Sequence, residues 1–78
     1  MLDHEMVMSI AQKISNSLED NFFDIDKRKF FDAVFARYFP AVDPAGTMEP
    51  YDAVVNLGRQ DPSEFEKMVK ELEDKGLI

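Results

Sequence analysis

Only a few residues in this chain have the types and the spacing that metal binding requires. His4 and Glu5 begin the stretch HEMVM, which has the first half of the zinc-binding helix motif H-E-x-x-H. Met8 occupies the position of the second histidine, so the motif fails. His4 is also the only histidine, and the chain has no cysteine. The sequence therefore predicts no zinc site and no disulfide.

The sequence has no residue pattern for calcium binding or for catalysis either. A calcium-binding EF-hand loop that began at Asp24 would need Gly at its sixth position and Glu at its twelfth, which hold Lys29 and Phe35. A serine nucleophile needs a base, and there is no second histidine to act as one. The three glycines are isolated, so no glycine-rich phosphate loop is present. We expect no cofactor and no enzymatic activity.

A basic cluster, Lys27, Arg28 and Lys29, lies where a helix is expected to begin, and Arg37 follows on the same helix. Cations at this end oppose the helix dipole, which favours anions there. One interpretation is that they neutralise neighbouring carboxylates on an acidic surface. The other is that they form a basic edge that docks onto an acidic patch of a partner. Helical spacing scatters the four cations around the helix instead of lining them along one stripe.

Aromatic residues give a second candidate surface. Seven of the 78 residues are Phe; Phe22 and Phe23 precede the second expected helix, and Phe39 follows its apolar face. Either most of the Phe side chains form the core, or some form an exposed patch that binds a protein or a second copy of the chain. Met8 also lies off the apolar stripe of its helix, and methionine is common at binding surfaces.

The carboxylates near the C-terminal end form a third candidate, an acidic face that imitates nucleic acid and occupies a basic groove. This face consists of Asp61, Glu64, Glu66, Glu71, Glu73 and Asp74.

The composition suits one small folded domain over residues 1–78. Hydrophobic residues make up 45% of the chain and aromatic residues 12%, which indicates a globule instead of disorder. The formal net charge is −7, which repels phosphate backbones and anionic membranes. No stretch approaches a membrane span, and the first residues do not have the pattern of a signal peptide. We expect a cytoplasmic protein.

The apolar periodicity predicts four helices and no strand. The first runs over about 3–18 and begins at a cap, Asp3. The second runs over about 27–39 with Asp26 as its cap and Ile25 stapled to Phe30, and its broad aromatic face predicts the central helix. The third is short, over about 48–57, with Thr47 as its cap and Gly58 closing it. The fourth begins after the cap Asp61 with Pro62 and is closed by Gly76, after which Leu77 folds back onto the last turn.

The last two helices resemble the helix-turn-helix and winged-helix superfamily. The residues that carry the resemblance are Leu57-Gly58, then Phe65, Val69 and Leu72, then Gly76-Leu77-Ile78, within residues 50–78. The resemblance implies a DNA-binding module whose last helix reads base edges. That helix opens with Asp61, Ser63, Glu64 and Glu66, whereas recognition helices present Arg, Lys, Asn or Gln there. Duplex binding through this helix is therefore not expected.

These observations favour an all-α fold, a small bundle of three main amphipathic helices and one short helix whose C-terminal pair has helix-turn-helix-like geometry. The expected function is protein–protein interaction, as a small acidic adaptor or an inhibitor of a larger assembly. The expected partner is another protein, or a second copy in a homodimer. Two alternatives stay open: a nucleic-acid-binding module that uses the four cations, and an acidic mimic of nucleic acid.

Overall fold

The computed structural model describes residues 3–78, and within them the chain is all-helical, as predicted, with no strand. The four α-helices have 17, 14, 11 and 13 residues, so the third is only slightly shorter than the others. A short 3-10 helix, which the sequence does not predict, follows the second α-helix. In chain order the elements are α1 (His4–Asp20), α2 (Ile25–Tyr38), η1 (Phe39–Ala41), α3 (Pro50–Gln60) and α4 (Pro62–Asp74).

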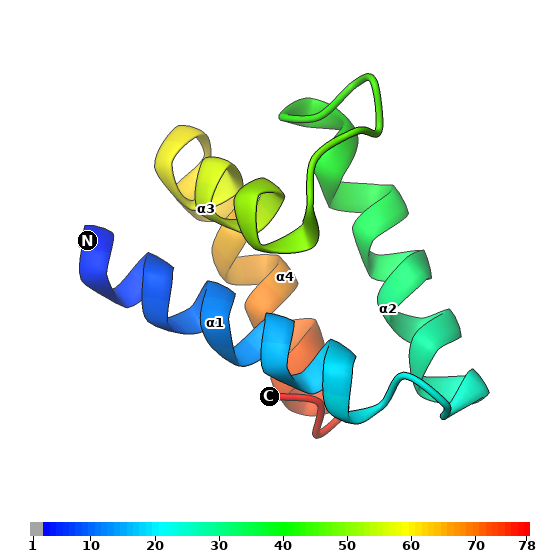
Figure 1. The fold of residues 1–78 in the computed structure, drawn as a ribbon. Coiled ribbons are helices and arrows are strands. Elements are labelled where there is room, and N and C mark those ends of the chain that lie inside the picture. The colour runs from blue at the N-terminus through cyan, green and yellow to red at the C-terminus, as the bar shows by residue number, and fades with distance from the viewer. Residues whose placement is uncertain (1–2) are drawn as a thin grey trace.

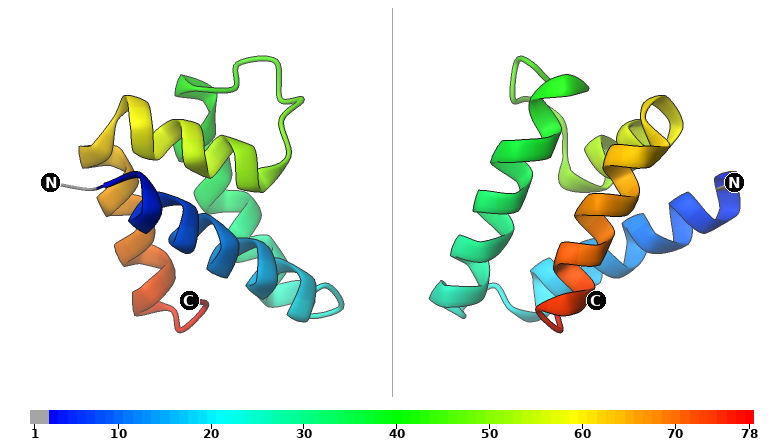
Figure 2. Two further views of the ribbon diagram at one scale, coloured as in Figure 1. Left: turned by 60° about the vertical axis from the view of Figure 1, so that its left-hand side comes forward. Right: turned by 180° about the vertical axis from the view of Figure 1, so that it is seen from behind.

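The helices form two pairs that are not consecutive along the chain. α1 packs on α3, and α2 packs on α4, with the members of each pair running in roughly opposite directions (Figures 1 and 2). α1 and α2 diverge from the turn that joins them and pack little on each other (Figure 1). The radius of gyration of 11.5 Å is that of a compact chain of this length.

The core lies where the two pairs meet, and α3 is its centre. α3 packs on α1, on α4 and on η1, and it buries four residues along its length. The prediction that α2 is the central helix is wrong, because α2 buries only Phe31 and Val34. Its other aromatic side chains are only partly covered. The buried hydrophobic residues are Val7, Ala11, Ile14, Phe31, Val34, Ala53, Val54, Leu57, Phe65, Met68, Leu72 and Leu77.

α4 begins and ends as the sequence predicts. The Asp61 carboxylate accepts a hydrogen bond from the Glu64 amide at 3.2 Å, and a proline occupies the first turn. Gly76 has a φ of 77°, which a left-handed helix end requires. The Leu77 amide then donates to the Leu72 carbonyl at 2.9 Å, and the Leu77 side chain is buried.

The start of α2 differs from the prediction. Asp24, and not Asp26, is the cap, because its carboxylate accepts from the Lys27 amide at 3.1 Å. The helix therefore begins two residues earlier than predicted. The predicted staple is also wrong: Ile25 is exposed and lies inside the first turn of the helix.

The loop before α3 is organised by Asp43 and not by Thr47. The two carboxylate oxygens of Asp43 accept hydrogen bonds from the amides of Thr47 and Met48, each at 3.1 Å. Glu49 occupies the cap position of α3 without a side-chain hydrogen bond. The Asp43 bonds hold the loop in a closed turn, so the cap predicted at Thr47 is not formed.

Gly58 lies within α3, which continues to Gln60, so the predicted helix end at Gly58 is wrong. The residue is buried against α1: a Cβ atom at this position would lie 2.6 Å from Val7 Cγ1. Glycine here therefore allows close packing of two helices. Asp61 alone separates α3 from α4, so the turn of the predicted helix-turn-helix is not at Leu57-Gly58.

Candidate interaction surfaces

The turn between α1 and α2 carries the most exposed apolar side chains that the structure describes. Phe22, Phe23 and Ile25 are 53%, 92% and 69% exposed, and we call these three residues the apolar tip. Every residue from 22 to 29 is exposed. The Phe22 and Phe23 rings contact each other edge to face, with centroids 5.0 Å apart.

Hydrogen bonds of Asn21 and Asp24 close the backbone around the apolar tip. Asn21 ends α1: its side-chain amide donates to the Ser17 carbonyl at 2.8 Å. Asp24 starts α2 three residues later and also donates its own amide to the Asn21 carbonyl. The connection between α1 and α2 consists of residues 21–24 only, and the Phe22 and Phe23 side chains remain exposed on it.

Three of the four predicted cations lie beside the apolar tip. Lys27 pairs with Asp24 at 3.8 Å. The Arg28 guanidinium lies 4.7 Å from the centre of the Phe22 ring, in a cation–π contact, and donates to the Phe22 carbonyl at 3.4 Å. Lys29 is exposed one residue further on. We call Lys27, Arg28 and Lys29 the basic edge.

Arg37 does not belong to the basic edge, because it ties α2 to α4. Its guanidinium donates to one carboxylate oxygen of Glu71, and the Tyr38 hydroxyl donates to the other. These bonds, the Tyr38 one first, lower the pKa of Glu71 below its ordinary value. The same contact raises the pKa of Tyr38 and that of Arg37. The sequence predicts Arg37 and Glu71 on two different binding surfaces, whereas the structure brings them together as an interhelical contact.

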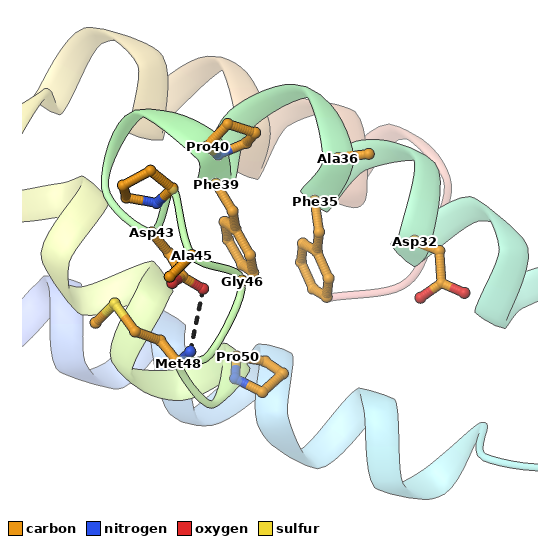
Figure 3. A pocket seen from close by; sticks show the side chains of 11 residues that line it. Asp32, Phe35, Ala36, Phe39, Pro40, Asp43, Ala45, Gly46, Met48 and Pro50 are labelled. Carbon is orange, nitrogen blue, oxygen red and sulfur yellow. Dashed lines mark hydrogen bonds between the residues drawn. The ribbon is translucent and has the colours of Figure 1, made fainter.

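Phe39 lies at the far end of α2 and lines a groove that sequence reasoning missed. The groove separates the C-terminal half of α2 from the loop 42–49 and has a volume of about 430 Å³ (Figure 3). Phe35 and Phe39 stack with ring centroids 4.3 Å apart and project into it. The groove is lined by Asp32, Phe35, Ala36, Phe39, Pro40, Asp43, Pro44, Ala45, Gly46, Met48 and Pro50.

The predicted acidic face is divided between two flanks of α4. Residues seven apart lie on the same side of a helix, so Glu64 and Glu71 share one flank while Glu66 and Glu73 share the other. The buried stripe of α4 lies between these two flanks.

Most members of the predicted acidic face are also engaged locally. Asp61 caps α4, Glu64 pairs with Lys67 at 3.2 Å, and Asp74 pairs with Lys70 at 3.6 Å. Glu71 is held by α2. The six carboxylates are therefore not one continuous surface.

The seven Phe side chains divide into three groups by burial. Phe31 and Phe65 are fully buried, Phe22 and Phe23 are exposed, and the remaining three are partly buried. The sequence pattern predicts Ile25 in a staple and therefore does not indicate it as a surface residue, although its side chain is 69% exposed. Its place beside two aromatic residues in a polar stretch is the signal that could have revealed it.

The described residues form neither a metal-binding cluster nor a membrane-spanning helix. Among residues 3–78, no three His, Asp or Glu side chains gather closely enough to hold a metal ion. No helix in the same part of the chain is long and apolar enough to cross a membrane.

Comparison of the chain with protein-family models, with curated proteins and with solved structures finds no match.

Proposed function

We propose that the chain is a small acidic protein–protein interaction module that binds its partner through the apolar tip. The observation that carries this proposal is the exposure of three large apolar side chains, Phe22, Phe23 and Ile25, within four consecutive residues at the turn between α1 and α2. Aromatic side chains dominate interface energetics, and each buries ~150–250 Å² when it is covered.

Folding does not account for these three residues. The turn is closed by hydrogen bonds of Asn21 and Asp24, and the core is built without any atom of the tip. A large apolar side chain that is left fully exposed forgoes ~1.5–3 kcal/mol of burial free energy, and Phe23, at 92% exposure, is close to that limit. A partner that covers the tip recovers that free energy, which supports a binding role.

The basic edge narrows the chemistry of the partner. It places three cations beside the tip in a chain whose net charge is −7. A partner surface that combines an apolar pocket with carboxylates on its rim matches both features. Arg37 and Phe39, the other two residues predicted to bind the partner, lie away from this surface and are not part of it.

The two alternatives have weaker support. A nucleic-acid module needs cations gathered on one face, but Arg37 is engaged by Glu71. The joint of one residue between α3 and α4 is also shorter than the three- or four-residue turn of a helix-turn-helix. An acidic mimic needs a continuous carboxylate surface, whereas the candidate carboxylates lie on two flanks of α4.

The proposal is tested by affinity capture from a lysate of the source organism, with and without nuclease. The wild-type chain is compared with Phe23→Ser/Ile25→Ser and with Met6→Ser/Met8→Ser. The second variant is a matched control, because Met6 and Met8 are also exposed, at 48% and 40%, but lie on α1 away from the turn. We expect a captured protein that is lost with the tip variant and kept with the control.

Three results would contradict the proposal. Equal capture by all three chains would show that the tip is not the binding surface. Recovery that nuclease abolishes would favour the nucleic-acid module. Capture of a basic protein that depends on Glu66 and Glu73 instead of the tip would favour the acidic mimic.

A further inference from the structure

The groove of Figure 3 has the surface chemistry that the apolar tip requires of a partner. Its walls are the stacked rings of Phe35 and Phe39 on one side and the Pro44–Met48 segment on the other. Its volume of about 430 Å³ lies within the range of pockets that hold small ligands or single side chains.

The charges of the groove and of the basic edge are complementary. Two carboxylates, Asp32 and Asp43, line the groove, and no cation does. Asp43 is engaged by the loop amides, while Asp32 is exposed on α2 and points to the same side as the two rings (Figure 3). Residues 22–29 hold three cations and two carboxylates, for a net charge of +1. The tip and its basic edge thus meet an apolar, acidic surface.

One molecule cannot place its own tip in its own groove. The tip precedes α2, whereas the groove is lined by the second half of α2 and by the loop that follows its far end. Figure 1 shows the turn before α2 and the loop after it at opposite ends of the helix. A helix of 14 residues is ~21 Å long, and it is rigid. The two surfaces can meet only between molecules.

We infer that the apolar tip of one molecule docks into the α2–loop groove of a second copy of the chain. Phe23, the most exposed of the tip residues, enters between the Phe35–Phe39 stack and the loop, and the basic edge faces Asp32. This inference rests on the proposed function and names the occupant of the tip. The contact joins unlike surfaces, so it repeats head to tail and builds short open oligomers or a closed ring.

The size of the two surfaces sets the strength of the contact. Phe22, Phe23 and Ile25 are 53%, 92% and 69% exposed, so the tip has roughly 400 Å² of side-chain surface left to bury, or about 800 Å² counting both molecules. That area is below that of stable specific interfaces and in the range of weak, transient contacts. The net charge of −7 on each molecule adds repulsion, so association is expected at high micromolar concentration and above.

The test is sedimentation velocity of the full chain between ~10 µM and ~1 mM, at ~0.15 M salt to screen the overall charge. The tip variant is Phe23→Ser/Ile25→Ser. The groove variant is Ala36→Arg, which adds bulk and positive charge at an exposed α2 position that lines the groove. Arg is a good helix former, and circular dichroism confirms that each variant is folded. We expect the wild-type average mass to rise with concentration and each variant alone to stay monomeric.

Mixing the two variants is the decisive measurement. The tip variant keeps a working groove and the groove variant keeps a working tip, so the mixture should form a 1:1 dimer and nothing larger. A wild-type chain that is still monomeric at ~1 mM would overturn the inference, as would association that the mixed variants do not restore. Neither result bears on capture of a different protein by the tip, which the affinity experiment measures separately.

Discussion

Gly58 shows how one side chain, or its absence, fixes the distance between two helices. A Cβ atom at this position would lie 2.6 and 2.9 Å from the two Val7 methyl carbons and 3.2 Å from Phe65 Cδ2. Val7 is branched at Cβ and is buried, so it has little freedom to move aside. The approach of α3 to α1, the pair with the most extensive packing in the molecule, depends on this glycine.

We expect Gly58→Ala to destabilise the fold by about 1–2 kcal/mol. Overpacking of a core costs ~1–3 kcal/mol, which exceeds the ~0.5–1 kcal/mol that alanine contributes to a helix interior. Urea unfolding measures the change. The Val7→Ala variant lacks the methyl groups that oppose a Cβ atom at position 58. Gly58→Ala introduced into this variant should therefore leave its stability unchanged or raise it. An equal cost in both backgrounds would show that Val7 is not what excludes the methyl group.

At the scale of the helices, the beginning of α2 depends on which of two carboxylates two residues apart acts as its cap. Asp24 accepts from the Lys27 amide, and Asp26 lies inside the first turn. Asn21 closes α1 just before, which leaves only the short turn 21–24 for the change of direction.

Asp24→Ala should therefore destabilise the protein by about 1 kcal/mol, the usual cost of losing an N-cap. Asp26→Ala is the matched control, with the same loss of charge near the same helix end, and should change stability by no more than a few tenths of a kcal/mol. Thermal unfolding of the two variants compares them directly. A larger loss of stability for Asp26→Ala than for Asp24→Ala would show that Asp26 is the cap, as the sequence predicts.

A side-chain contact ties α2 to α4. Tyr38 and Arg37 lower the pKa of Glu71 from its ordinary value of 4.5. A carboxyl group whose pKa is lower in the folded state adds stability above its ordinary pKa, and that stability is lost as the pH falls through the folded value. Wild-type protein should therefore exceed Glu71→Gln in stability at pH 7, with the difference shrinking below about pH 4.5.

Urea unfolding at pH 7, 5, 4 and 3 measures that difference. Glu66→Gln, on the opposite flank of α4, is the control for the loss of one carboxylate from this helix. A stability difference between wild type and Glu71→Gln that is the same at pH 7 and pH 3 would show that the ionised carboxylate does not stabilise the fold.

The parts of the fold that could be predicted from sequence are those with local signals. The helical periodicity and the Asp61, Pro62 and Gly76 signals of α4 lie within a few residues of the structure they determine. The sequence predicts the cap of α2 two residues too late, at Asp26, because local spacing does not distinguish Asp26 from Asp24. The sequence predicts a helix end at Gly58. The contact that explains this glycine is with Val7, 51 positions away in the chain, so it leaves no local signal.

The surfaces were predicted less completely, because exposure is a property of the folded molecule. Phe22-Phe23 and Phe30-Phe31 are both Phe pairs followed by Asp, yet the first pair is exposed and Phe31 is fully buried. The partnership of Arg37 with Glu71 spans 34 residues and leaves no local pattern. The groove is formed jointly by the end of α2 and by the loop whose amides Asp43 binds, so no single segment of the sequence indicates it.

Across the molecule, the residues that build the core and those that form the tip are separate sets. Phe31 and Phe65 are fully buried at the junction of the helices, whereas the tip residues project beyond it. We expect Phe23→Ser/Ile25→Ser to change the free energy of unfolding by no more than ~0.5 kcal/mol. Phe65→Ala should cost ~3–5 kcal/mol, enough to unfold much of a small domain.

Urea unfolding of both variants, followed by circular dichroism, tests this separation. A tip variant that loses more than ~1 kcal/mol would show that the tip packs onto the core in solution.

The way α1 and α2 diverge has a consequence for how this protein can change over time. Each of the two helices is anchored by a different neighbour, α1 by α3 and α2 by α4, and the turn between them is closed by Asn21 and Asp24. Side chains at positions 22, 23 and 25 can therefore be replaced with little effect on folding. Selection, or an engineer with a randomised library, can vary these positions to obtain a new binding specificity on an unchanged scaffold.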